Sequence, residues 1–183
     1  MKTSIRLRPL LLSSISFLIA ALAFSQSPDL KIGDTYAGGI VFYLDGNGGG
    51  LVAAPEDQGK DVAWYNGNYV ETGAIAMGIG DGESDTATIV AMQGKGDYAA
   101  SLCANLDIGG FKDWYLPSTE ELSLIYLNLF KHNISGFVLG FYWTSTENDL
   151  HFASALNFNN GGIVMKVKML KMNVRAIRAF QFQ

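Results

Sequence analysis

The sequence predicts an α+β domain with an antiparallel sheet, hairpins and about two to three helices. Runs of β-branched and aromatic residues, bounded by glycine-rich turns, lie near both ends of the chain. Apolar residues at helical spacing are concentrated in the middle. A single cysteine, Cys103, excludes an intrachain disulfide. We therefore expect one domain, residues 26–183, that is held together by its apolar core.

The first hairpin is predicted over residues 38–55. Residues 38–44 are rich in β-branched and aromatic side chains, and residues 51–55 resemble them. Between them, residues 45–50 contain mostly Gly, Asn and Asp, which tolerate the positive φ of tight turns. A loop follows over residues 55–71.

Two helices are expected next. Asp85 or Thr86 caps a helix that runs through Met92, and Asp97 caps a second one that ends near Leu106. Cys103 lies on the apolar face of the second helix, where nothing nearby lowers its pKa. We interpret it as a buried structural thiol.

The central segment, residues 109–122, carries the strongest local signals. A short buried strand is expected at residues 114–116, and Pro117 stops it. Ser118 and Glu121 have the spacing of a capping box for the next helix. That helix places four apolar residues on one face, namely Leu122, Ile125, Tyr126 and Leu129. Strands from both ends of the chain are expected to pack against this segment.

The C-terminal part predicts further strands. Residues 141–146, 151–158, 163–169 and 174–180 have strand character, and residues 159–162 form a hairpin turn. In residues 163–169, Val167 and Met169 alternate with Lys166 and Lys168.

Residues 1–25 have the composition of a secretory signal peptide. A basic start precedes an apolar run over residues 10–24, and small residues suit cleavage before Gln26. A retained transmembrane helix is the alternative, but serines interrupt the run. We expect export through the Sec pathway, no transmembrane anchor after cleavage, and a secreted or cell-surface location.

The charge is unevenly distributed. Removing three cations from a chain of net charge −4 leaves −7. Residues 150–183 hold five cations and no acid, whereas residues 26–149 hold seventeen acids and five cations. An acidic body argues against nucleic-acid binding. Lys166 and Lys168, with Arg175 or Arg178 adjacent, form a candidate anion contact. A solvated sheet face or a protected strand edge explains the same lysines.

Four ordered motifs resemble the DUF1566 family, which includes the C-terminal domain of the Legionella collagen-like adhesin and is related to the Fibrobacter paralogous domains. They lie at residues 38–43, 114–122, 142–147 and 174–178. The resemblance implies a secreted or surface-exposed bacterial domain with a C-type-lectin-like fold. It also implies an adhesin-like role, since the best-known member binds sulfated glycosaminoglycans as a trimer. This chain lacks a collagen-like repeat, paired cysteines and the Trp-Asn-Asp motif of animal C-type lectins.

Two loops have the chemistry of a carbohydrate-binding site, in which aromatic faces meet the apolar sides of sugar rings and polar groups take the hydroxyls. Trp114 and Trp143 lie in strand-like runs and are expected in the core, whereas Trp64 suits either role. The candidate ligand-binding residues are Trp64, Tyr65 and Asn66 in the first loop and Glu147, Asn148, Asp149 and His151 in the second.

Calcium is the only cofactor that the sequence suggests. Asp81, Glu83 and Asp85 place carboxylates at alternate positions, as calcium ligands often do, but the register of an EF-hand fails. A capped loop before a helix explains the same residues.

Catalytic signatures are sparse, and we expect no enzyme. The chain has two histidines and no nucleophile elbow or zinc spacing. A carboxylate pair for glycoside hydrolysis, such as Glu83 with Glu147, is left open. The expected function is an exported, non-enzymatic module that binds a glycan or another cell-surface partner. The alternative is a structural or self-assembly domain without a small ligand, and a homo-oligomer is left open.

Overall fold

The computed structural model describes residues 29–182, and these form an α+β fold with two sheets. The predicted signal peptide lies outside these residues. The smaller sheet has the order β1-β2-β3-β9 and the larger one β4-β8-β5-β6-β7. The smaller sheet consists of β1 (Thr35–Tyr36), β2 (Gly39–Leu44), β3 (Gly49–Ala53) and β9 (Ile177–Gln181). The larger one consists of β4 (Gly59–Ala63), β8 (Lys171–Val174), β5 (Phe141–Glu147), β6 (Phe152–Asn157) and β7 (Gly162–Val167).

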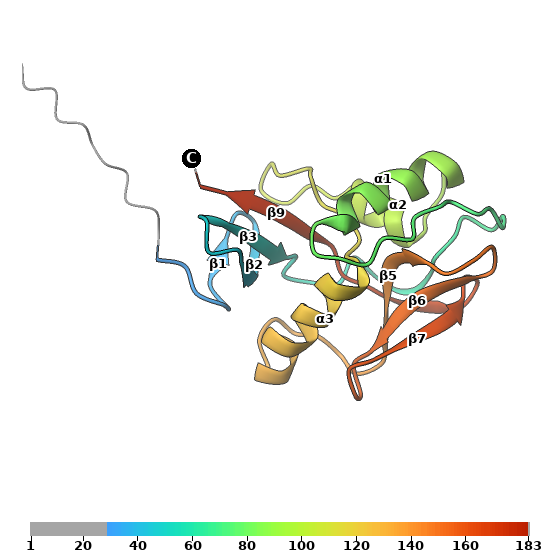
Figure 1. Cartoon of the computed structure of the whole chain (residues 1–183). Coiled ribbons are helices and arrows are strands. Elements are labelled where there is room, and N and C mark those ends of the chain that lie inside the picture. Colours follow the sequence, from blue (N-terminus) through green and yellow to red (C-terminus); the bar gives the residue numbers. More distant parts are fainter. Residues whose placement is uncertain (1–28, 183) are drawn as a thin grey trace, which may run out of the picture.

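Three α-helices accompany the sheets. They are α1 (Asp81–Gln93), α2 (Ala99–Ala104) and α3 (Thr119–Asn128), and a short 3-10 helix, η1 (Phe130–His132), follows α3. Figure 1 shows α1 and α2 side by side, with α3 lying between the two sheets. The helix α3 contacts β2 on one side and β5 and β6 on the other. Within residues 29–182, no helix has both the length and the apolar character needed to span a membrane.

Strand pairing follows the hairpins that the sequence predicts and adds long-range pairs. The two predicted hairpins, β2–β3 and β6–β7, are antiparallel, and so is the pair β5–β6, for which no hairpin turn was predicted. β9 returns from the end of the chain to pair with β3, so that both ends of the described chain share one sheet (Figure 1). β5 and β8 meet in parallel at Tyr142 and Asn173. The prediction of an α+β class without disulfides is confirmed, with this parallel contact as an addition.

In the central segment, residues 109–122, the predicted capping box forms, but the predicted strand at residues 114–116 does not. Ser118 Oγ accepts a hydrogen bond from Glu121 N at 3.3 Å, and Ser118 N donates to Glu121 Oε2 at 2.8 Å. This capping box starts α3. Instead of a full strand, Tyr115 makes an isolated bridge to Ile177 of β9. The segment therefore links the last strand to α3.

The core consists of two apolar clusters, one of which contains all three tryptophans, Trp64, Trp114 and Trp143. The other cluster packs α3 against β2 and β5. The expectation that Trp114 and Trp143 fill the core is confirmed. Cys103 is also fully buried, and burial raises the pKa of its thiol. It is a structural residue, as the sequence indicates.

Several boundaries differ from the prediction. The cap of α2 is Tyr98 rather than Asp97, and the predicted strand over residues 174–180 is divided between β8 and β9. The helix α1 begins at Asp81, directly after Gly80 with φ 93°, rather than at Asp85 or Thr86. The left-handed conformation of Gly80 ends the preceding loop, so the cap lies at Gly80 rather than at Asp85 or Thr86. The predicted loop over residues 55–71 contains the strand β4, which forms because β8 pairs with it.

Candidate functional site

The two predicted carbohydrate-binding loops meet at the surface through three aromatic rings. The ring of Tyr69 lies 4.8 Å from that of Tyr65 and 4.8 Å from that of His151, measured between centroids. We call Tyr65, Tyr69 and His151 the aromatic cluster. Tyr69 is 37% exposed, and His151 is also exposed. The rings tilt by 34° and 54° to one another, and Tyr65 is partly buried.

Trp64 packs in the core next to the first loop, and neither face of its ring is accessible to a ligand. Its side chain is fully buried, and its indole Nε1 donates to the carbonyl of Thr144 at 2.9 Å. The ammonium group of Lys168 lies 4.7 Å from the centre of its ring. The prediction that Trp64 contacts a ligand is therefore wrong. Tyr69, in the same predicted loop over residues 55–71, is the exposed aromatic residue next to it.

The rest of the first loop is tied to the end of α1. The backbone N–H of Asn66 donates to Gln93 Oε1 at 3.1 Å, and its side-chain amide donates to the Gln93 carbonyl. Asn66 Oδ1 in turn accepts from Asn68 N at 2.9 Å. The side chain of Asn66 is therefore used to shape the loop. Asn68, which is exposed beside Tyr69, has a side-chain amide that makes no hydrogen bond within residues 29–182.

The second loop is the turn between β5 and β6. Asp149 Oδ1 accepts from His151 N at 2.7 Å and from Phe152 N at 2.8 Å. These backbone hydrogen bonds lower the pKa of Asp149, so the carboxylate remains ionised. Asn148 Oδ1 accepts from Ser154 Oγ at 3.1 Å. Asn148 and Asp149 are both exposed, and each keeps a second polar atom that is not bonded within residues 29–182.

Glu147 and Lys168 form a buried ion pair beneath the cluster. Lys168 Nζ lies 2.5 Å from Glu147 Oε1, and the two side chains are 0% and 3% exposed. Glu147 also accepts from the backbone N–H groups of Thr72 and Gly73. Burial alone raises the pKa of Glu147, but the hydrogen bonds from Lys168 and the two backbone groups outweigh it and lower the pKa.

The ion pair corrects two predictions. Glu147 does not face a ligand, and it is not one member of an open carboxylate pair with Glu83. Lys168 is not an anion contact, because it lies on the same side of the chain as Val164 and Lys166, and its side chain is fully buried. Lys168 Nζ also donates to the carbonyls of Val70 and Leu150, so the pair fastens both loops to one another.

The other cations of the predicted anion face are also engaged. Lys166 Nζ lies 4.3 Å from the centre of the Phe141 ring. Arg175 is buried and bonded to Asp57 at 2.7 Å, and Arg178 makes two hydrogen bonds of 2.7 Å to Asp113. Arg175 and Arg178 thus serve the fold, whereas the anion contact of Lys166 stays a prediction.

The predicted calcium ligands do not converge. Asp81, Glu83 and Asp85 all lie in α1, where residues two apart point to nearly opposite sides. Asp81 Oδ2 accepts from Gly78 N at 2.7 Å, Glu83 is exposed and Asp85 is buried. Among residues 29–182, no three His, Cys, Asp or Glu side chains are grouped to hold a metal ion. The alternate spacing of the three carboxylates was misleading because α1 begins earlier than expected, so that these residues lie in a helix and not in a loop.

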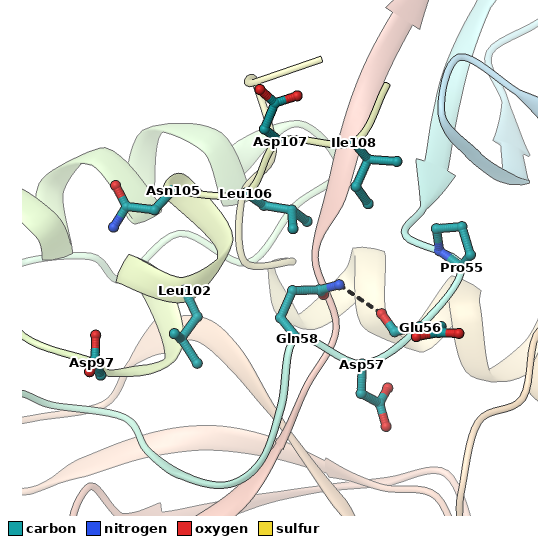
Figure 2. Close-up of a pocket in the computed structure, with 10 residues that line it drawn as sticks. All are labelled: Pro55, Glu56, Asp57, Gln58, Asp97, Leu102, Asn105, Leu106, Asp107 and Ile108. Carbon is teal, nitrogen blue, oxygen red and sulfur yellow. Dashed lines mark hydrogen bonds between the residues drawn. The ribbon is translucent and has the colours of Figure 1, made fainter. Parts of the chain in front are cut away.

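A groove that the sequence did not suggest lies between the β3–β4 connection and the region of α2 (Figure 2). Its volume is about 580 Å³. Leu102, Leu106 and Ile108 give it an aliphatic wall, and Glu56, Asp97 and Asp107 contribute carboxylates. Asn105 adds an amide, and Asp57 is already paired with Arg175. This lining lacks aromatic rings. Its two sides, residues 55–58 and 97–108, are distant in sequence, so no local pattern could indicate it.

Comparison with known proteins does not assign a family. No protein-family model matches the chain. A partial similarity exists to the bifunctional purine biosynthesis protein PurH of Acidithiobacillus ferrooxidans, with 33% identity over 70 residues. The similar stretch is 38% of this chain and 11% of that protein, so the chain spans a small part of its length. A match of this extent transfers neither a fold nor an activity.

Proposed function

We propose that this chain is an exported, non-enzymatic binding module that recognises a glycan through the aromatic cluster. The observation that carries the proposal is the meeting of Tyr65 and Tyr69 with His151, which lies about eighty residues away in sequence. Aromatic surfaces of this kind bind the apolar sides of pyranose rings. The resemblance to the DUF1566 family supports the same class of function.

Polar groups beside the rings can form the hydrogen bonds to sugar hydroxyl groups that recognition of a glycan also requires. The exposed amides of Asn68 and Asn148 and the ionised carboxylate of Asp149 offer donors and acceptors for hydroxyl groups. They lie in the same two loops as the rings. Because Glu147 and Lys168 join these loops from below, the site is held in shape before a ligand arrives, which reduces the entropic cost of binding.

The charges favour an uncharged glycan over a sulfated one. Lys168 is buried and paired, and Arg175 and Arg178 are bonded to carboxylates. Asp149 places a negative charge beside the rings, which would repel a sulfate group. We therefore propose that the ligand is neutral, in contrast to the sulfated ligands of the best-known member of the DUF1566 family.

A glycan array on the full chain tests the proposal. We expect hits among neutral glycans that persist in EDTA and in about 0.5 M salt, because neither a metal ion nor a screened ionic contact is involved. The variant Asn105→Ala, which removes an amide from the groove of Figure 2, should keep the same hits. A blank array with folded protein would refute the proposal. Hits confined to sulfated glycans would refute the choice of ligand, and loss of hits in Asn105→Ala would move the site to the groove.

A further inference from the structure

The strand β7 forms an edge of the larger sheet and carries exposed apolar side chains. In the strand order it has one neighbour, β6, with which it pairs in a continuous register from Gly162 to Val167. Ile163 is 53% exposed and Met165 is 65% exposed. Both lie on the same face of the strand, since side chains alternate along it. This combination is uncommon, because a regular apolar edge invites pairing with another strand.

The opposite edge of the same sheet is protected. The register of β4 shifts between Gly59 and Val62, and Asp61 has a φ of 58°. Lys60 and Asp61 are exposed on this strand. A bulge and outward charges are two of the devices that prevent edge pairing. The register of β7 has no such shift, and the one charged side chain of the strand, Lys166, lies over the ring of Phe141.

The backbone of β7 also offers hydrogen bonds at this edge. Lys168 N donates to His151 O at 2.9 Å, which fixes the direction of its N–H group towards the β6 side. Residues two apart in a strand point their N–H and C=O groups the same way, and neighbours point them the opposite way. Ile163 and Met165 therefore direct these groups outward. Within residues 29–182, no turn, loop or side-chain hydrogen bond occupies the groups of these two residues, whereas the carbonyl of Val167 accepts from Leu170 N at 2.9 Å.

We propose that β7 pairs antiparallel with β7 of a second copy of this chain, about a two-fold axis at Met165, so that two sheets become one. The strand is complementary to itself in this register. Met165 meets Met165 of the partner subunit, and Ile163 meets Val167 of the partner subunit, so apolar side chains face one another. Lys166 lies opposite Val164 of the partner subunit, which keeps the two lysines from meeting directly.

A charge at the axis tests the pairing. The full chain is compared with its variant Met165→Lys by analytical ultracentrifugation from about 1 µM to about 100 µM, the range in which weak dimers form. The natural chain should dimerise within this range. The variant places two ammonium groups opposite one another and should weaken the dimer by about tenfold or more. Met92→Lys, which alters a methionine that is 51% exposed on α1, should leave the dimer unchanged.

A mixture of two variants with opposite charges at position 165 distinguishes specific strand pairing from non-specific hydrophobic association. Met165→Lys and Met165→Glu should each be monomeric where the natural chain is dimeric, and an equal mixture of the two should dimerise again. Circular dichroism checks that both variants fold, as the exposure of Met165 leads us to expect. A monomeric natural chain at about 100 µM, an unaltered dimer in Met165→Lys, or a mixture that stays monomeric would each overturn the proposal.

Discussion

Replacing Asp85 with asparagine should stabilise the protein at neutral pH. Asp85 lies in α1, is 5% exposed, and its Oδ2 atom has no hydrogen-bond partner within residues 29–182. Burial raises the pKa of this carboxyl group from 3.8 to about 6, and the negative charges of Asp81 and Glu121 add to the effect. The folded protein therefore holds this proton more tightly than the unfolded chain.

The size and sign of the effect follow from this shift. A shift of about two pKa units corresponds to about 3 kcal/mol, which is an upper value for the cost of ionising Asp85 in the folded state. There is no cost below about pH 4. The cost grows as the pH rises towards 6 and is constant above it. Asp85→Asn removes the charge and should raise the melting temperature by up to about 10 °C at pH 7.5.

The assay is thermal unfolding followed by circular dichroism between about pH 4 and pH 8, the interval that brackets the shifted pKa. The stabilisation of Asp85→Asn relative to the natural chain should be near zero at the acid end and increase through pH 5 to 6. Glu83→Gln, which removes an exposed carboxylate from the same helix, is the control and should show no such increase. A variant that is less stable at pH 7.5, or equally stabilised at both ends, would refute the reasoning.

Three further predictions concern the interior. Glu147→Gln leaves the buried ammonium of Lys168 without its charge partner and should lower the free energy of unfolding in urea by about 3 to 5 kcal/mol. The double variant Glu147→Gln with Lys168→Met should lose less stability, because no unpaired charge is then buried. An equal loss in the two variants would show that the ion pair does not couple the loops. Ser118→Ala removes the cap of α3 and should cost about 1 kcal/mol in the same assay, whereas an unchanged midpoint would contradict the cap's role. Cys103 should react with a thiol reagent only after denaturation, and rapid labelling of the native protein would contradict its burial.

The sequence correctly predicted the turns and helix starts that are formed by hydrogen bonds between residues close together in the chain. The turn after β2 forms because Asp45 accepts hydrogen bonds from Asn47 N and Gly49 N, and such turns are visible in composition. The start of α3 was predicted for the same reason, since Ser118 and Glu121 satisfy one another's backbone within a single turn. These features depend on residues that lie within about four positions of one another.

The errors concern side chains whose position is decided by distant parts of the chain. Trp64 is buried because β4 pairs with β8 and places the indole against Thr144, about eighty residues away. Lys168 is buried because Glu147 lies there to receive it. The candidate binding site likewise depends on contacts between distant parts of the chain, which the sequence could not predict. The sequence indicated each of the two loops, but the contact between Tyr69 and His151 depends on how the sheet brings the loops together.

The most direct test of the account is the affinity of Tyr69→Ala for a neutral glycan that the natural chain binds on the array. The matched control is Phe111→Ala, since Phe111 is 36% exposed and Tyr69 is 37% exposed, and Phe111 lies against Arg178 rather than in the aromatic cluster. Isothermal titration should show that Tyr69→Ala weakens binding by about fivefold to tenfold, because the loss of an aromatic contact is worth about 1 to 1.5 kcal/mol. Phe111→Ala should bind as the natural chain does. Unchanged affinity in a folded Tyr69→Ala would contradict the assignment of the aromatic cluster as the binding site.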